Sequence, residues 1–154
     1  ANAVELLGEG GYRTVHLATH GYFDEEPANA FLLAHDDKLT LNMLEDTIGK
    51  RRFLGDPLDL LVLSACQTAQ GNERAALGLA GVSLKAGATT TIASLWPIDD
   101  ASTAQIMNSL YAGLDGGTPT TTALRNAQLT LIRSGTYQDH PLYWSPFLVI
   151  GNWL

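Results

Sequence analysis

The sequence predicts a layered α/β fold, in which a mainly parallel sheet is flanked by helices. Short apolar runs of strand length alternate with longer stretches that have helical spacing, which is typical of this class. The short runs are too apolar for a sheet with one face in water, which favours buried strands. With 154 residues the chain is long enough to bury most of its unfolded surface. We therefore expect a single domain over residues 1–154.

The predicted strands are rich in β-branched and large apolar residues. They are residues 14–18, 58–65, 89–95 and 147–150. A shorter strand at 31–34 leads into a hairpin turn at His35, and a further turn is expected at 139–141, before the last strand. Right-handed crossovers place the carboxyl ends of parallel strands on one edge, where ligands bind in open α/β sheets.

The predicted helices are bounded by capping and stop residues. They are the end of a helix at 4–7, a short helix at 41–48, and three longer helices at 73–86, 100–113 and 119–133. Gly87 ends the first of the longer helices, and the second begins after Asp99 and Asp100 and ends at Gly113. The third has Thr118 as N-cap, Pro119 at the first helical position and Gly135 beyond its end. Helices of this length between buried strands fit crossover connections.

The charge balance disfavours nucleic acid and membrane as partners. The chain has nine basic and sixteen acidic residues, for a net charge of −7. Its basic cluster, Lys50-Arg51-Arg52, is interpreted as a solvated loop, and phosphate binding needs a larger basic patch. No apolar run reaches the roughly 18 residues of a membrane span. We therefore expect a globular protein that binds neither nucleic acid nor membrane.

The composition also limits cofactors and location. One cysteine forms no internal disulfide, which favours a reducing, cytoplasmic location. Four scattered histidines and one cysteine do not form a metal-ligand pattern. No phosphate-binding or cofactor motif is evident. We expect neither a metal nor a cofactor.

Two predicted strands end in residues that can carry covalent chemistry. His20-Gly21 ends the first, and Cys66 ends the second. An imidazole stabilises a cysteine thiolate and then protonates the leaving amine, and Gly21 can supply an N–H to an oxyanion. The alternatives are a small buried cysteine and a structural histidine. Because both residues lie on one predicted edge, a catalytic pair is supported about as well as these structural alternatives.

Five segments, in order along nearly the whole chain, resemble the CHAT family of caspase-like and separase-like peptidase domains. They are HLATHG (16–21), LVLSACQT (61–68), ASLWPIDD (93–100), ALRNAQ (123–128) and HPLYWSPFLVIGNW (140–153). The resemblance implies that His20 and Cys66 are the catalytic pair, with the N–H groups of Gly21 and Cys66 holding the oxyanion. His16 matches a family position that is not used as the general base, and we interpret it as core packing.

The resemblance also implies where a substrate side chain binds. Separases have a similar Leu-Trp…Asp segment whose acid helps bind a basic residue at the cleavage site. By this similarity Asp99 or Asp100 pairs with Arg or Lys of the substrate. The alternative is that an acid here caps the following helix. Trp96 either walls that pocket or packs between helix and sheet.

The resemblance implies a cysteine endopeptidase that cleaves a protein substrate after a specific residue. CHAT domains are often joined to TPR repeats in bacterial proteins, so such repeats are expected partners. The family's full domain has strands before the histidine strand, so this chain resembles its C-terminal portion, and the open sheet edge suggests a homo-oligomer. The alternatives are a catalytically silent scaffold module and, last, a small-molecule-binding α/β domain.

Overall fold

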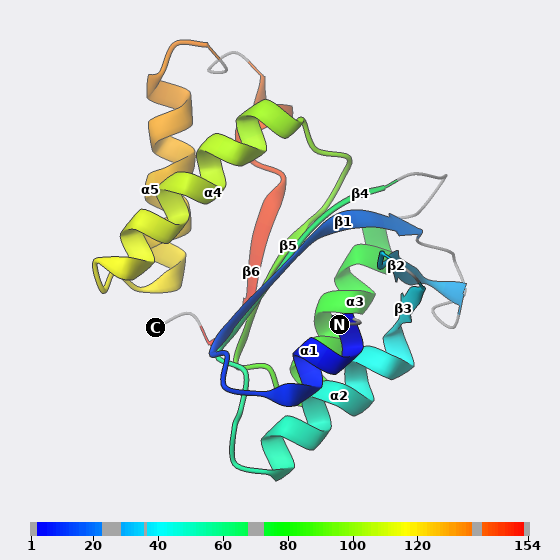
Figure 1. Cartoon of the computed structure of the whole chain (residues 1–154). Coiled ribbons are helices and arrows are strands. Elements are labelled where there is room, and N and C mark those ends of the chain that lie inside the picture. The colour runs from blue at the N-terminus through cyan, green and yellow to red at the C-terminus, as the bar shows by residue number, and fades with distance from the viewer. Residues whose placement is uncertain (1–2, 23–28, 36, 68–72, 137–139, 153–154) are drawn as a thin grey trace.

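The computed structural model describes residues 3–22, 29–35, 37–67, 73–136 and 140–152, without the side chains of residues 3, 65–67 and 73–79. The elements follow one another along the chain as Figure 1 shows. They are α1 (Ala3–Glu9), β1 (Thr14–Tyr22), β2 (Phe31–Leu33), β3 (Lys38–Thr40), α2 (Leu41–Phe53), β4 (Leu60–Gln67), α3 (Glu73–Ala86), β5 (Thr90–Ser94), α4 (Asp100–Asp115), α5 (Thr120–Arg133), α6 (Pro141–Trp144) and β6 (Phe147–Gly151).

The strands form one mixed sheet in the order β3-β2-β1-β4-β5-β6. β1, β4 and β5 are parallel to one another, and the strands outside them pair antiparallel. Helices α1 to α3 cover one face of the sheet, and α4 and α5 stand on the other (Figure 1). The predicted α/β layered class is confirmed, with the parallel pairing confined to the centre of the sheet.

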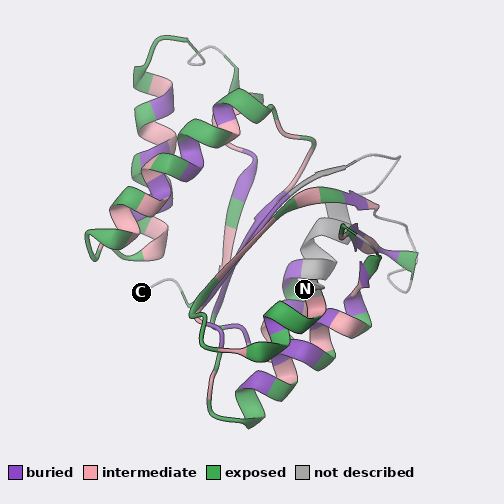
Figure 2. Ribbon diagram, in the orientation of Figure 1, coloured by how far each residue is buried: buried purple, intermediate pink, exposed green. Residues whose placement is uncertain are grey.

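Two apolar clusters, one on each face of the sheet, hold the layers together (Figure 2). The first includes Leu44 and Ile48 of α2, and the second includes Ile106 and Leu110 of α4, all of them fully buried. Burying a large aliphatic side chain contributes about 1.5–3 kcal/mol, so these clusters are the main source of stability.

The strands differ in burial more than their apolar character predicts. Every residue of β5 is buried, as are residues 60–64 of β4. β1 instead exposes Thr14, Ala18 and His20. The expectation that all strands are buried on both faces is wrong for β1, whose exposed residues all lie on the face that carries His16.

The helix boundaries confirm some sequence signals and correct others. α3 matches the predicted helix, and Gly87 ends it with a φ of +121°. α4 passes through Gly113 to Asp115. A Cβ on Gly113 would lie 3.1 Å from Cβ of Ala123, so this glycine permits close approach of α5 and does not stop the helix.

Three other segments also depart from the sequence-based expectation. Pro119 occupies the N-cap of α5 in place of Thr118. His140 caps the short helix α6 where a turn was predicted. α2 extends to Phe53, so the basic cluster at 50–52 is helical, and Arg51 is only 1% exposed. The interpretation as a solvated loop is therefore wrong for Arg51. The predicted hairpin after β2 is confirmed by its pairing with β3.

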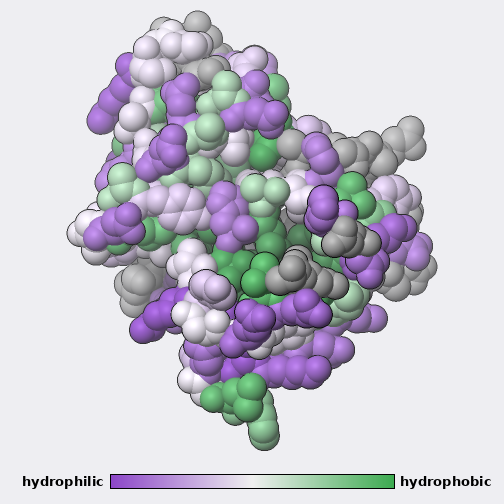
Figure 3. All heavy atoms as spheres, in the orientation of Figure 1, coloured by the Kyte–Doolittle hydropathy of each residue, from purple (hydrophilic) through white to green (hydrophobic). Residues whose placement is uncertain are grey.

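The surface of the chain combines polar helices with small apolar areas. Figure 3 shows an apolar projection at the lower end of the molecule, where α2 ends, and Phe53 and Leu54 there are 90% and 76% exposed. Among the residues that the structure describes, no helix has the length and apolar character to cross a membrane.

Candidate active site

The candidate catalytic residues lie opposite each other on neighbouring strands. In the parallel pairing of β1 with β4, His20 is the register partner of Cys66, and Gly21 is the partner of Gln67. Adjacent strands are about 4.8 Å apart, so the two backbones are close at this position. The imidazole of His20 is exposed, whereas the side chain of Cys66 lies outside the described part. The fold therefore brings the two backbone positions together at the carboxyl edge of the sheet.

His20 lines a cavity of about 390 Å³ between this part of the sheet and α4, which we call the site cavity. Its lining combines polar groups with apolar walls from both layers. The residues are His16, Ala18, Thr19, His20, Ser64, Ile98, Asp100, Thr103, Ala104 and Met107. A cleft with mostly apolar walls and a few convergent polar groups has the general character of a ligand-binding site.

The two acids before and at the start of α4 take different positions. Asp99 is the N-cap, and its Oδ2 accepts a hydrogen bond from the backbone N–H of Ser102 at 2.9 Å. Asp100 lines the site cavity together with His20. The cap alternative thus describes Asp99, and Asp100 is the acid that a ligand in the cavity can reach.

His16 lies further along the same cavity and bonds through both ring nitrogens. Its Nε2 is 2.7 Å from Oγ of Ser64, and its Nδ1 is 2.9 Å from the hydroxyl of Tyr111 on α4. Burial lowers the pKa of His16 below its ordinary 6.5 and raises the pKa of Tyr111. The sequence interpretation as core packing missed that His16 lines the cavity. Its spacing of four from His20, on one face of a strand, is the signal that points to it.

Gly21 and Trp96 stand apart from the cavity lining. Gly21 is buried in β1 at a position paired on both sides, with Leu32 and Gln67. Trp96 is half-buried, and its Nε1 donates to the carbonyl of Leu142 at 3.3 Å. Trp96 therefore joins the segment before α4 to α6 and does not line the site cavity.

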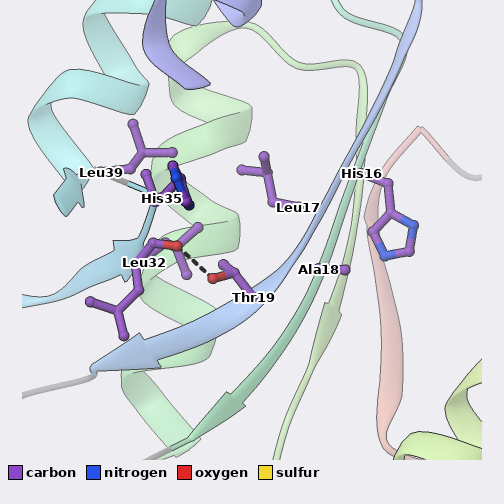
Figure 4. A pocket seen from close by; sticks show the side chains of 9 residues that line it. His16, Leu17, Ala18, Thr19, Leu32, His35 and Leu39 are labelled. Atoms are coloured by element: carbon purple, nitrogen blue, oxygen red, sulfur yellow. Dashed lines mark hydrogen bonds between the residues drawn. The ribbon is translucent and has the colours of Figure 1, made fainter. Parts of the chain in front are cut away.

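A second cavity of about 270 Å³ lies on the other side of β1, beside the β2–β3 hairpin. Figure 4 shows Leu17 on this side and the ring of His16 on the opposite side of the strand. Thr19 donates from its hydroxyl to the carbonyl of Leu33 and so closes the cavity toward β2. Its lining, which includes His35, is mainly apolar, and no group of three potential metal ligands occurs among the described residues.

Comparisons with known proteins agree with the segments quoted from the sequence. The family model described as the CHAT domain matches residues 1–152. Tetratricopeptide repeat protein 28 of Homo sapiens is 30% identical over 98 residues, which cover 62% of this chain and 4% of that protein. The chain therefore spans only a small part of the length of this relative.

Proposed function

Because the chain belongs to the CHAT domain family, which lies in the caspase-like peptidase clan, we propose that it carries the catalytic dyad of a cysteine endopeptidase. The observation that carries the proposal is the register pairing of His20 with Cys66 on parallel strands. In addition, the exposed His20 opens into a cavity that also holds a carboxylate, at Asp100. A nucleophile and a base on one sheet edge, next to a cavity, are the parts that acyl transfer needs.

The proposed reaction proceeds in two steps. The thiolate of Cys66 attacks the scissile carbonyl carbon, and a backbone N–H at the site, such as that of Cys66, holds the oxyanion. When the tetrahedral intermediate collapses, the C–N bond breaks and the imidazolium of His20 gives its proton to the leaving amine. Neutral His20 then takes a proton from water, which attacks the thioester and releases the acid and Cys66. A dyad suffices, because a thiol ionises more readily than a hydroxyl.

We propose that the site cavity takes a basic side chain of the substrate. The aliphatic stem of Arg or Lys would contact Ile98 and Met107, and its charged end would pair with Asp100. Asp99 is already engaged by the N–H of Ser102 as a helix cap. Cleavage would therefore follow Arg or Lys, and Asp100→Asn is expected to reduce kcat/KM for such peptides more than Asp99→Asn does.

The pH dependence of iodoacetamide labelling at Cys66 tests the dyad without a known substrate. We expect a labelling midpoint below the free-thiol value of about 8.5, which rises in His20→Ala because the thiolate loses its cationic neighbour. His35→Ala is the matched control, because it removes another exposed histidine, one that lines the second cavity, and should leave the midpoint unchanged. A midpoint that is the same with and without His20 would reject the dyad.

A second function, a scaffold module that does not turn over substrate, is favoured by one observation. The relative reported above is named for tetratricopeptide repeats, and the match covers 4% of it. Under this second function the domain binds such repeats of a parent protein. We also propose that it forms a homo-oligomer and that it is located in the cytoplasm. The scaffold function would be favoured if Cys66 is labelled slowly, at the same rate with and without His20, and if peptides with Arg or Lys are not cleaved.

A further inference from the structure

His16 marks the inner end of the site cavity. His20 and Asp100 are exposed at the carboxyl edge of the sheet, whereas His16 is half-buried and Ser64 is only 6% exposed. His16 precedes His20 by four residues, which is about 13 Å along a strand. The cavity therefore extends from the exposed His20 and Asp100 to the more buried His16 and Ser64, which we call its floor.

The hydrogen bonds of His16 join three elements. A neutral imidazole donates through one nitrogen and accepts through the other. The phenol of Tyr111, the ring of His16 and the hydroxyl of Ser64 therefore form one chain from α4 through β1 to β4. Tyr111 lies on the helix that begins with Asp100, so this chain helps to hold the cavity's carboxylate in place over the sheet.

The charge of His16 matters because of the groups around it. Ser64 faces it from β4, Tyr111 faces it from α4, and His20 of β1 and Asp100 of α4 share its cavity. Asp100 is the one acidic residue in that lining as described, and burial keeps the ring of His16 neutral near pH 7 by lowering its pKa. A protonated ring would repel a cation entering the cavity.

We propose that His16 is a specificity-determining residue: while its ring between Ser64 and Tyr111 is neutral, the site cavity prefers a cationic side chain, and protonation of the ring weakens that preference. The inference rests on the proposed function, because it concerns the substrate residue of that site. Protonation of His16 adds a positive charge at the cavity floor and lowers the affinity for a cationic ligand. A neutral ligand of the same shape is affected much less. The preference for a cation therefore falls as the pH drops through the folded pKa of His16, which lies below its ordinary 6.5.

The test compares acetyl-arginine amide with acetyl-citrulline amide, which have similar shapes but differ in charge. Calorimetry gives the ratio of their Kd values at pH 7.5 and at pH 5.5, on the full chain. We expect an arginine preference of up to about fivefold at pH 7.5, the size of a partly exposed ion pair, and a smaller ratio at pH 5.5. His16→Gln, whose amide donates and accepts but does not protonate in this range, should retain the preference at both values.

Three further variants make the test specific. Tyr111→Phe leaves His16 in place but removes its bond to α4, so the arginine preference should weaken already at pH 7.5. Asp100→Asn removes the carboxylate and should abolish the preference, which separates its contribution from that of His16. His35→Gln makes the same change in the second cavity, and should behave as the unaltered chain does.

Several results would overturn the inference. They are equal affinity for both ligands at pH 7.5, no binding of either, or the same pH dependence in the unaltered chain and in His16→Gln. The ratio in the unaltered chain and in Tyr111→Phe decides the matter if His16→Gln does not fold. These ligands are bound and not cleaved, so peptidase activity is a separate readout. If the chain cleaves peptides but its arginine preference does not change with pH, this inference is rejected and the peptidase function is kept. If the arginine preference depends on His16 but no peptide is cleaved, only the peptidase function is rejected.

Discussion

Two junctions join helices to the region of β1, on opposite faces of the sheet, and they differ in charge. On the α2 side, Arg51 is 1% exposed and donates from Nη2 to Oδ2 of Asp56 at 2.8 Å and to the carbonyl of Tyr12. Gly11 donates its N–H to the same carboxylate oxygen at 2.9 Å. On the α4 side, Tyr111 and Ser64 bond to His16 and bring no charged group.

The difference follows from what each junction adjoins. The Arg51–Asp56 junction closes the end of α2 against the segment that leads into β1, and neither residue lines the site cavity. The N–H of Gly11 and then the guanidinium of Arg51 lower the pKa of Asp56, which keeps the pair ionised. The His16 junction forms the floor of the site cavity, where under the proposal above an added charge would change which ligand binds. A neutral junction is then a requirement of the proposed site and not of the helix end.

The largest expected effect comes from breaking the charged junction with Arg51→Ala. This change removes a buried side chain together with its bonds to Asp56 and Tyr12, and the lost packing should lower the free energy of unfolding by about 2–3 kcal/mol. Urea unfolding measures the loss. Arg52→Ala, one residue further on and exposed, is the control, with an expected change within about 0.5 kcal/mol. Equal losses in the two variants would show that the junction is not stabilising.

Breaking the neutral junction with Tyr111→Phe should cost less. The change removes one hydroxyl and leaves Nδ1 of His16 without its partner, at an expected cost of about 1 kcal/mol. Thermal or urea unfolding at pH 7.5 gives the value. Tyr143→Phe, in a half-buried tyrosine packed against the same apolar cluster, is a comparison within that layer. A cost as large as that of Arg51→Ala would contradict the distinction between the junctions.

Acid should weaken the charged junction at low pH. The pKa of Asp56 is lower in the folded chain than its ordinary value of 3.8, so its contribution is complete above that value and is lost as the pH falls through the folded pKa. Asp56→Asn should lack this part of the acid dependence. The difference between the two unfolding curves, followed from pH 6 to pH 2, isolates it. Parallel curves across that range would show that Asp56 is not linked to folding.

The neutral junction should respond at higher pH, and with the smallest effect. The pKa of His16 is below 6.5 in the folded chain, so the unfolded chain binds the proton first. Stability from His16 is therefore present above pH 6.5 and declines as the pH falls from there toward the folded pKa. His16→Gln should remove this decline, as measured by unfolding between pH 8 and pH 5. An unchanged decline in the variant would assign it to another group.

The sequence predicts the elements well where local patterns dominate. The helix at 73–86 and its glycine stop are as expected, because helical spacing and a positive φ are properties of a short stretch of chain. The alternation of strands and helices gave the α/β class for the same reason. The pairing of His20 with Cys66 agrees with the rule that parallel strands end on one edge, although their catalytic roles stay a prediction.

Other features depend on which segments meet in space. Gly113 has the local signature of a helix end, but the approach of α5 explains why it is glycine. Arg51 belongs to a basic run that is typical of a surface, but it lies in the last turn of α2, on a side of the helix that is buried. The two acids at the start of α4 are equivalent in the sequence, and the geometry of the first helical turn assigned one to the cap and the other to the cavity.

The sequence by itself thus determined the class of the fold, most of its elements and the strand ends that carry His20 and Cys66. These follow from periodicity, capping and turn chemistry, which act over a few residues. Only the tertiary structure decided that His16, Ser64 and Tyr111 form one neutral hydrogen-bonded chain beneath the site cavity. Their separations of 48 and 95 residues explain this, because such contacts form only when helix and sheet pack together.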